Sequence, residues 1–258
     1  GHDINYIAIS GALHAIGRQG GKPTPPLNLV GDFGGGGMLL AFGMVCALLE
    51  AQRSGKGQVV DAAMIDGSIA LMAMFIGMQH RGLSADAVGT HLLSGGAHYY
   101  DTYETSDGKF IAIGALEPQF YAELIEKAGL DAAMLSSAGM VSPKGRDPRV
   151  WSELKRYMTD AFRQRTRDEW CALLEGTDAC FAPVLTLSEA PTHPHNRARN
   201  AFVDVAGFVQ NAPAPRFSRT ATSTPQPAIQ DRADFEALLA RWGCSAEDAS
   251  GILSASAI

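Results

Sequence analysis

The sequence Gly-Asp-Phe-Gly-Gly-Gly-Gly-Met at residues 31–38 introduces an apolar run that ends at Gly55. The run has no proline, its apolar residues recur with helical spacing, and Arg53 followed by Gly55 is typical of a helix C-terminus. We therefore expect a buried helix that begins just after Asp32. Four consecutive glycines lose much backbone entropy on folding. They indicate either a ligand that lies against the backbone or a flexible turn capped by Asp32.

The composition is that of a globular enzyme with one large or two modest domains. The chain has 258 residues, of which 46% are hydrophobic and 19% charged. A net charge of −6 leaves no basic surplus, so no nucleic acid is expected as a partner. The cysteines lack metal-site spacing, which favours reduced thiols in a cytoplasmic protein. They are Cys46, Cys171, Cys180 and Cys244.

No membrane-spanning segment and no membrane partner are expected. The apolar run at 38–49 is too short to cross a bilayer, and the run at 59–78 contains Asp61 and Asp66. The first residues lack the basic and apolar regions of a signal peptide. The chain starts without an initiator Met, which is typical of a fragment, and targeting signals can then lie outside it.

Several segments have clear secondary-structure signals. Residues 62–78 predict a second buried helix, preceded at 58–61 by a short strand or an extended segment. A hairpin is predicted around Ser106-Asp107-Gly108, and a helix begins at Glu117 because Pro118 suits a first turn. Further helices are expected at 151–162, 167–174 and 233–242, a strand at 180–185, and a loop at 192–195. Residues 100–186 thus form a small α+β domain.

Several common catalytic and metal-binding motifs are absent. The glycines at 34–37 do not continue as a dinucleotide-binding GxGxxG, and no complete phosphate loop or GxSxG elbow is present. His193 and His195 flank Pro194, which blocks the helical spacing of a metal pair. No metal site is therefore expected.

Four segments in a fixed order resemble a known family. They are GHDINY at 1–6, NLVGDFGGG at 28–36, GKGQVVDA at 55–62 and GALEPQF at 114–120. This combination is similar to the family III CoA-transferases (the CaiB/BaiF-like superfamily) and, within them, to the α-methylacyl-CoA racemases.

The resemblance implies an α/β fold with a large Rossmann-like domain, a small domain, and two chains interlocked in a homodimer. Residues 1–99 would be the C-terminal part of the large domain with a linker helix. Residues 100–186 would be the small domain, and residues 187–258 the linker and segment that rejoin the large domain. The chain begins at GHDINY, so the N-terminal region that supplies most CoA contacts is expected to be missing.

The resemblance also implies an activity, the interconversion of (R)- and (S)-2-methylacyl-CoA thioesters through an enolate, without a cofactor. His2 and Asp32 would be acid/base groups on opposite faces of the α-carbon, with Glu117 supporting His2. Histidine changes protonation near neutral pH, and a neighbouring carboxylate orients the ring. A dry pocket favours a protonated carboxyl group, which would let Asp32 carry a proton. The acyl group itself stays open.

The remaining candidate residues would bind substrate, or would serve only in packing. The amides near Gly34 and Gly35 would stabilise the enolate oxygen. Asp3 and Tyr6 would touch CoA, and an acyl pocket would be lined by Met64, Leu93 and Tyr100.

Two other functions stay open. The first is acyl-CoA transfer, with Asp32 as the nucleophile. The second is a non-catalytic acyl-CoA-binding or dimerisation module.

Overall fold

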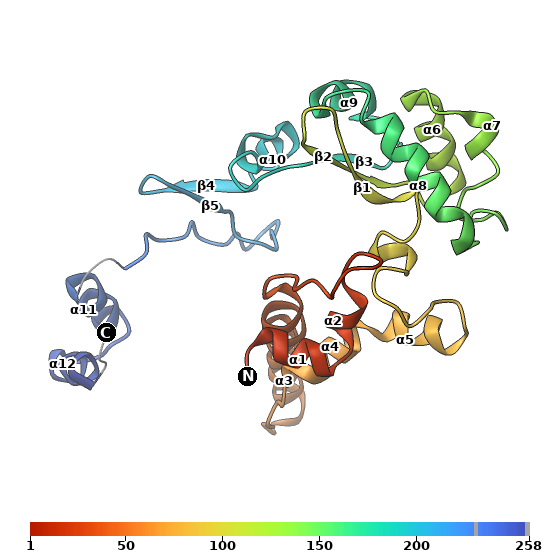
Figure 1. Cartoon of the computed structure of the whole chain (residues 1–258). Coiled ribbons are helices and arrows are strands. Elements are labelled where there is room, and N and C mark those ends of the chain that lie inside the picture. The colour runs from red at the N-terminus through yellow and green to blue at the C-terminus, as the bar shows by residue number, and fades with distance from the viewer. Residues whose placement is uncertain (230–231, 256–258) are drawn as a thin grey trace. The chain divides into compact units, whose positions relative to one another are not determined.

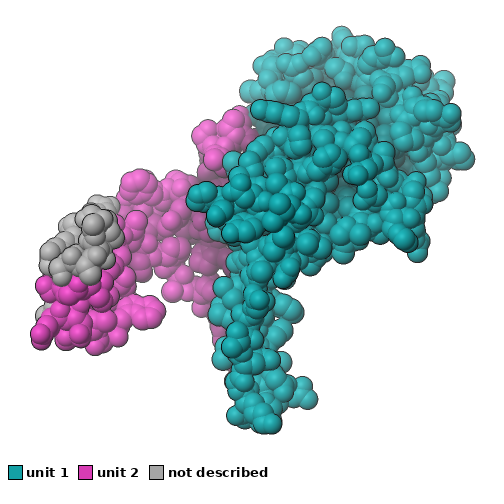
Figure 2. Space-filling view, turned by 60° about the horizontal axis from the view of Figure 1, so that its bottom comes forward, with its two compact units in different colours: residues 1–184 teal, residues 185–258 magenta. Residues whose placement is uncertain are grey.

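A computed structural model describes residues 1–229 and 232–255. The chain divides into two compact units, residues 1–184 and residues 185–258, which Figure 2 shows in different colours. The first unit contains a helical segment followed by a mixed helix and sheet region (Figure 1). The predicted domain boundaries near residues 99 and 186 stay predictions.

Residues 1–99, all of which are described, are helical and contain no strand apart from an isolated bridge between Gly17 and Pro23. Of the two forms expected at 58–61, the structure has the extended one, without strand pairing. The helices are α1 (Asp3–Ile9), α2 (Ala12–Ala15), the π-helix η1 (Leu29–Met38), α3 (Leu39–Ser54), α4 (Met64–Leu71), α5 (Ala73–His80) and the 3-10 turn η2 (Leu92–Ser94).

The glycines of η1 permit close packing of two backbones. A Cβ on Gly35 would lie 2.7 Å from the Ser68 nitrogen of α4, and one on Gly67 would lie 1.9 Å from the Gly35 carbonyl oxygen. Real Cβ atoms do not approach backbone this closely, so both positions need glycine. The wide π-helical turn is held in part by the Phe33 N–H, which donates to the Asn28 carbonyl at 3.2 Å.

The prediction of a helix that begins after Asp32 is wrong. Helical structure begins at Leu29, so Asp32 lies within the first turn of η1, and η1 continues directly into α3. The expected burial is also wrong, since no residue of α3 is buried and Phe42 is 68% exposed. The structure places few residues other than those of η1 against α3, which is drawn in Figure 1, so its apolar side chains stay exposed.

This continuity also corrects the expectation about membrane spans. Leu29–Ser54 is one helix of 26 residues that contains an 18-residue window with a mean hydropathy of 1.6, and it is therefore long and apolar enough to cross a bilayer. The sequence analysis expected the apolar segment to span only residues 38–49. The structure extends the helix to Leu29, because the glycines at 34–37 are part of the helix instead of preceding it. One such helix is weak evidence for a membrane protein, since core helices of other proteins meet the same criteria.

The second predicted helix, at 62–78, is two helices with little burial. The chain turns at Met72, between α4 and α5, and within these helices only Gly67 and Ser68 are buried. The apolar residues of this segment predicted helical structure correctly, but Met74 and Ile76 are about half exposed, at 53% and 49%.

Residues 100–184 form an antiparallel sheet with helices packed against it. The strand order is β1 (Tyr100–Glu104), β2 (Phe110–Gly114) and β3 (Phe181–Val184), with Tyr103 opposite Ile111 and Ile111 opposite Pro183. The predicted hairpin and third strand are confirmed. The helices are α6 (Pro118–Ala128), α7 (Ala132–Leu135), α8 (Pro148–Phe162) and α9 (Arg167–Leu174).

The core of this region consists of alternate strand residues and one face of each helix. Ile111 and Leu124 have no exposed surface, and the Phe162 ring lies 5.1 Å from both Tyr103 and Trp170, between ring centres. Apolar burial of this kind contributes about 25 cal/mol per Å². Most of the buried apolar residues in the described part of the chain lie in this region, which therefore supplies most of its hydrophobic stabilisation.

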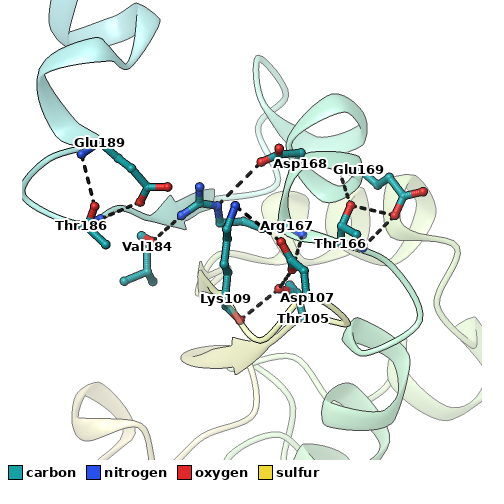
Figure 3. Close-up of polar contacts among 10 residues, drawn as sticks. All are labelled: Thr105, Asp107, Lys109, Thr166, Arg167, Asp168, Glu169, Val184, Thr186 and Glu189. Carbon is teal, nitrogen blue, oxygen red and sulfur yellow. Dashed lines mark hydrogen bonds and ion pairs between the residues drawn. The ribbon is translucent and has the colours of Figure 1, made fainter.

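The hairpin turn is fixed to the start of α9 (Figure 3). Asp107 accepts hydrogen bonds from the Thr105 hydroxyl at 2.6 Å and from the Arg167 N–H at 3.1 Å, and the Arg167 guanidinium donates to the Val184 carbonyl at 3.1 Å. Thr166 and Glu169 add a reciprocal capping box at the same helix end. The contacts join β1, β3 and α9 into one body.

The second unit has little core among the residues that the structure describes. It contains η3 (Ala190–Thr192), α10 (Pro194–Ala198), a hairpin of β4 (Phe202–Val205) and β5 (Phe208–Asn211), then α11 (Arg232–Arg241) and α12 (Ala246–Ala255). The loop predicted at 192–195 is wrong, since Pro194 begins α10, where a proline costs no hydrogen bond.

Candidate functional site

The carboxylate of Asp3 joins the start of α1 to the start of η1. Asp3 is buried, at 6% exposure, and its Oδ2 accepts hydrogen bonds from the backbone N–H groups of Gly31 at 2.8 Å and Asp32 at 2.7 Å. A Cβ on Gly31 would lie 2.6 Å from this oxygen, so glycine is required there. Free N–H groups in a first helical turn favour an anion. This contact brings His2, the neighbour of Asp3, to the turn that carries Asp32.

His2 is the N-cap residue of α1, and Asn5 fixes its backbone. The His2 N–H donates to Asn5 Oδ1 at 2.9 Å, and the Asn5 N–H donates to the His2 carbonyl at 2.9 Å. The His2 residue is exposed, and it forms a reciprocal capping box with Asn5 at the start of α1. Its exposed ring is accessible to a ligand.

Asp32 is half-buried and has one side-chain partner that the sequence reasoning missed. Asn28 Nδ2 donates to Asp32 Oδ2 at 3.3 Å from the residue that precedes η1. The spacing of four residues could have indicated this pair, because side chains four apart meet on a helix. Asn28 holds one carboxylate oxygen and leaves the other for a reacting group.

Glu117 caps α6 at the edge of the small sheet region and is exposed. Among the residues that the structure describes, no hydrogen bond or ion pair joins Glu117 to His2, so their expected contact stays a prediction. The pKa of the Cys180 thiol is raised, first by burial and then by the charges of Glu117 and Asp178. Glu117 therefore acts electrostatically on Cys180, which lines the cavity described next.

A cavity of about 900 Å³ lies between the helical segment and the sheet of the first unit. Its lining is mainly apolar and includes Leu71, Phe75 and Ile113. Of the residues predicted to bind substrate, Leu93 and Tyr100 line it. Its wall also includes Val30 of η1, two residues before Asp32.

The other predicted binding residues lie outside this lining. Met64 packs toward η1, where a Cβ on Gly36 would lie 3.6 Å from its Cγ. The ring of Tyr6 lies near Gly1, and Gly34 faces Leu71. Their roles in substrate binding stay predictions.

His91 is a cavity residue that the sequence reasoning missed. Its Nδ1 accepts the Leu93 N–H at 3.1 Å, so Nε2 carries the proton and faces Met78 Sδ at 3.4 Å. Burial lowers the pKa of His91, which keeps the ring neutral. The ring meets Phe75 edge-on at 4.8 Å and completes an apolar wall.

The side chains give no positive indication of a metal. Within 1–229 and 232–255, no group of three His, Cys, Asp or Glu residues is placed to hold a metal ion.

Residues 1–233 match the family described as CoA-transferase family III, and the chain belongs to this family. It is 47% identical over 221 residues to the alpha-methylacyl-CoA racemase of Mus musculus, with 85% of this chain and 56% of that protein covered. It is 44% identical over 229 residues to the alpha-methylacyl-CoA racemase of Homo sapiens, covering 85% of this chain and 58% of that protein. The chain thus spans little more than half the length of these relatives.

The fold is similar to that of a solved CaiB/BaiF family protein from Brucella suis. The TM-score is 0.70 at 20% sequence identity, with 94% of this chain and 62% of that chain covered. The predicted family III fold is confirmed by this similarity and by the family match.

Proposed function

We propose that the protein to which this chain belongs is an isomerase that interconverts (R)- and (S)-2-methylacyl-CoA thioesters. The observation that carries the proposal is the 47% identity over 221 residues to a protein named alpha-methylacyl-CoA racemase. The arrangement of His2, Asp3 and Asp32 at the start of two helices supports it, because the reaction needs two acid/base groups near one carbon.

In the proposed mechanism, His2 and Asp32 face the α-carbon from opposite sides. One group removes the α-proton, and its electron pair forms the enolate of the thioester. The group on the other side then returns a proton to the carbon, which inverts the configuration. Asp3 holds the backbone of Asp32, and Asn28 holds its carboxylate, so the base has a defined orientation. Glu117 would stabilise the protonated form of His2.

The apolar cavity is proposed to receive the acyl chain. Its size of about 900 Å³ and its apolar lining suit a branched hydrocarbon group of considerable length. The acyl chain would extend from the thioester near η1 along Val30 toward Leu93 and Tyr100.

Several features of the whole protein belong to the same proposal. The reaction needs no redox or metal cofactor, because both proton transfers use side chains. We propose a homodimer in the cytoplasm, without a membrane partner; the four free cysteines support a reducing compartment.

Transfer of CoA between carboxylates is the main alternative, and it would use Asp32 as a nucleophile. The proposal of racemisation is supported over transfer because the two relatives described above are both named racemases.

The test follows the α-proton in heavy water. The natural gene product that contains this chain is incubated with one epimer of a 2-methylacyl-CoA, and deuterium content and configuration are measured together. We expect deuterium uptake with loss of configuration in the unchanged protein, and a decrease of about 10²–10⁴-fold in the rate of inversion for His2→Ala or Asp32→Ala. His80→Ala and Asp61→Ala, which change exposed residues outside the cavity lining, serve as matched controls.

The alternatives give different results in the same assay. Movement of CoA to an added carboxylate without deuterium uptake would make Asp32 a transferase nucleophile. Binding of the thioester without either reaction would favour a non-catalytic module.

A further inference from the structure

A buried carboxylate in the cavity wall joins three separate parts of the first unit. Asp101, on β1, has a side chain that is only 6% exposed. One of its oxygens accepts from the guanidinium of Arg18, which follows α2, and from the Thr102 N–H at 2.8 Å. The other oxygen lies 2.7 Å from Nζ of Lys155 on α8. Arg18 also donates to the Thr102 hydroxyl at 2.6 Å.

The same cluster fixes the turn that follows η2. Lys155 donates to the carbonyl of Gly95 as well as to Asp101. Gly95 has φ +81°, and a Cβ there would lie 2.6 Å from Arg18 Nη1 and 2.7 Å from Asp101 Oδ1. The backbone of the turn therefore lies directly against the ion cluster, and its positive φ favours glycine.

Apart from α8, the parts that Asp101 joins are walls of one cavity. Arg18, Gly95 and Asp101 line it, as does Leu93, which lies in the turn that Lys155 holds. A buried carboxylate is stable only with partners, and its removal would leave two neighbouring cations without compensation. Their mutual repulsion would act on the loop that carries Arg18 and on the turn that carries Leu93.

We propose that Asp101 is a positioning residue that fixes the shape of the cavity and thereby determines which acyl-chain lengths are accepted. This inference rests on the proposed function, because it takes the ligand of the cavity to be the acyl chain of the thioester. Asp101 acts through Arg18, Lys155 and Gly95, not through contact with the reacting carbon.

The test compares Asp101→Asn with the unchanged protein on a short and a long 2-methylacyl-CoA. For the long substrate we expect KM to rise about tenfold with little change in kcat, the effect of losing the burial of about two methylene groups. For the short substrate both constants should stay within about twofold, because its chain does not reach Leu93. Glu104→Gln is the matched control, since Glu104 lies on the same strand in an exposed pair with Arg163.

Two further variants separate positioning from general loss of structure. Asp101→Glu keeps the charge but displaces it by one methylene. It should therefore change the preferred chain length, while KM for the long substrate rises less than in Asp101→Asn. Arg18→Gln combined with Asp101→Asn should raise KM for the long substrate no more than Asp101→Asn alone, because the double variant removes one uncompensated cation. A KM in the double variant that equals the product of the two single effects would overturn the inference.

A binding assay distinguishes failure of this inference from failure of the proposed function. The probe is the fluorescent fatty acid dansylaminoundecanoic acid, whose binding needs no reaction. If the protein does not racemise but Asp101→Asn still weakens probe binding about tenfold, the proposed function falls and the positioning role stands. If the protein racemises and Asp101→Asn has the same KM and kcat as Glu104→Gln for both chain lengths, the positioning role falls and the function stands.

Discussion

Two apolar helices of this chain have opposite environments. Helix α8 buries Leu154, Met158 and Phe162 against the small sheet, whereas α3, which is more apolar in sequence, leaves Phe42 and Leu48 about two-thirds exposed. Helical periodicity predicted both helices, since it depends on local sequence. Burial requires a partner surface, and among the described residues only α8 has a complete one.

The comparison shows where the stability of the chain arises. Residues 100–184 have a closed aromatic and aliphatic core, while the helices of 1–99 meet mainly through backbone contacts such as that of Gly35 with α4. The candidate acid/base groups of the first unit lie on the less well-packed region. The following changes test this difference in order of expected effect.

Truncation of a ring in each helix should give the largest contrast. Phe162→Ala should lower the free energy of unfolding by about 3–5 kcal/mol, through lost burial and a cavity among Tyr103 and Trp170. Phe42→Ala, at 68% exposure, should change it by about 0.5 kcal/mol or less. Urea unfolding of the chain of residues 1–258, followed by circular dichroism, measures both. Equal losses would contradict the proposed difference in packing.

Acid should weaken the small sheet region through His98. This ring is fully buried, its Nε2 lies 2.8 Å from the Tyr121 hydroxyl, and its Nδ1 has no partner in the described part of the chain. Burial, with smaller contributions from the charges of Lys144 and Lys155, lowers the pKa of His98 to about 3.

The sign of this effect follows from the lowered pKa. Below about pH 6.5 the unfolded chain takes up a proton that the folded chain excludes until about pH 3, so stability is full above pH 6.5 and is lost as the pH falls. The loss should reach on the order of 4 kcal/mol near pH 3. His98→Gln, which does not titrate, should remove this part of the pH dependence, whereas His80→Gln on exposed α5 should leave it. An unchanged slope in His98→Gln would contradict this assignment.

An added methyl group should destabilise a closely packed glycine of residues 1–99 but not an exposed one. Gly35→Ala would place a Cβ 2.7 Å from the Ser68 nitrogen, and should destabilise by about 1–3 kcal/mol. Gly77→Ala has nothing within 4 Å in an exposed helix, and should stabilise by about 1 kcal/mol or less. Thermal unfolding measures both changes. Stabilisation by Gly35→Ala would show that η1 and α4 do not pack closely in solution.

Local signals predicted the small sheet region well. The Ser106-Asp107-Gly108 turn, the proline at the start of α6 and the limits of α9 all depend on neighbouring residues, and the structure confirms them. The π-helix was not predictable in the same way, since its glycines are fitted to Gly67, more than thirty residues away.

The sequence analysis named candidate site residues, whose roles stay predictions, but it did not predict the contacts around them. The family resemblance named His2 and Asp32. The hydrogen bonds of Asp3 to the η1 amides and the cluster around Asp101 join residues 28 and 83 positions apart. No local pattern contains such contacts, because they depend on the packing of whole elements.

The most direct test of the account is deuterium exchange in a variant with only one of the two bases. With His2→Asn, Asp32 can still remove the proton that faces it and return a deuteron to the same side. We predict that one epimer exchanges without inversion and the other does not exchange, with the opposite preference in Asp32→Asn. Equal exchange or equal loss for both epimers in each variant would contradict a mechanism in which His2 and Asp32 act from opposite faces.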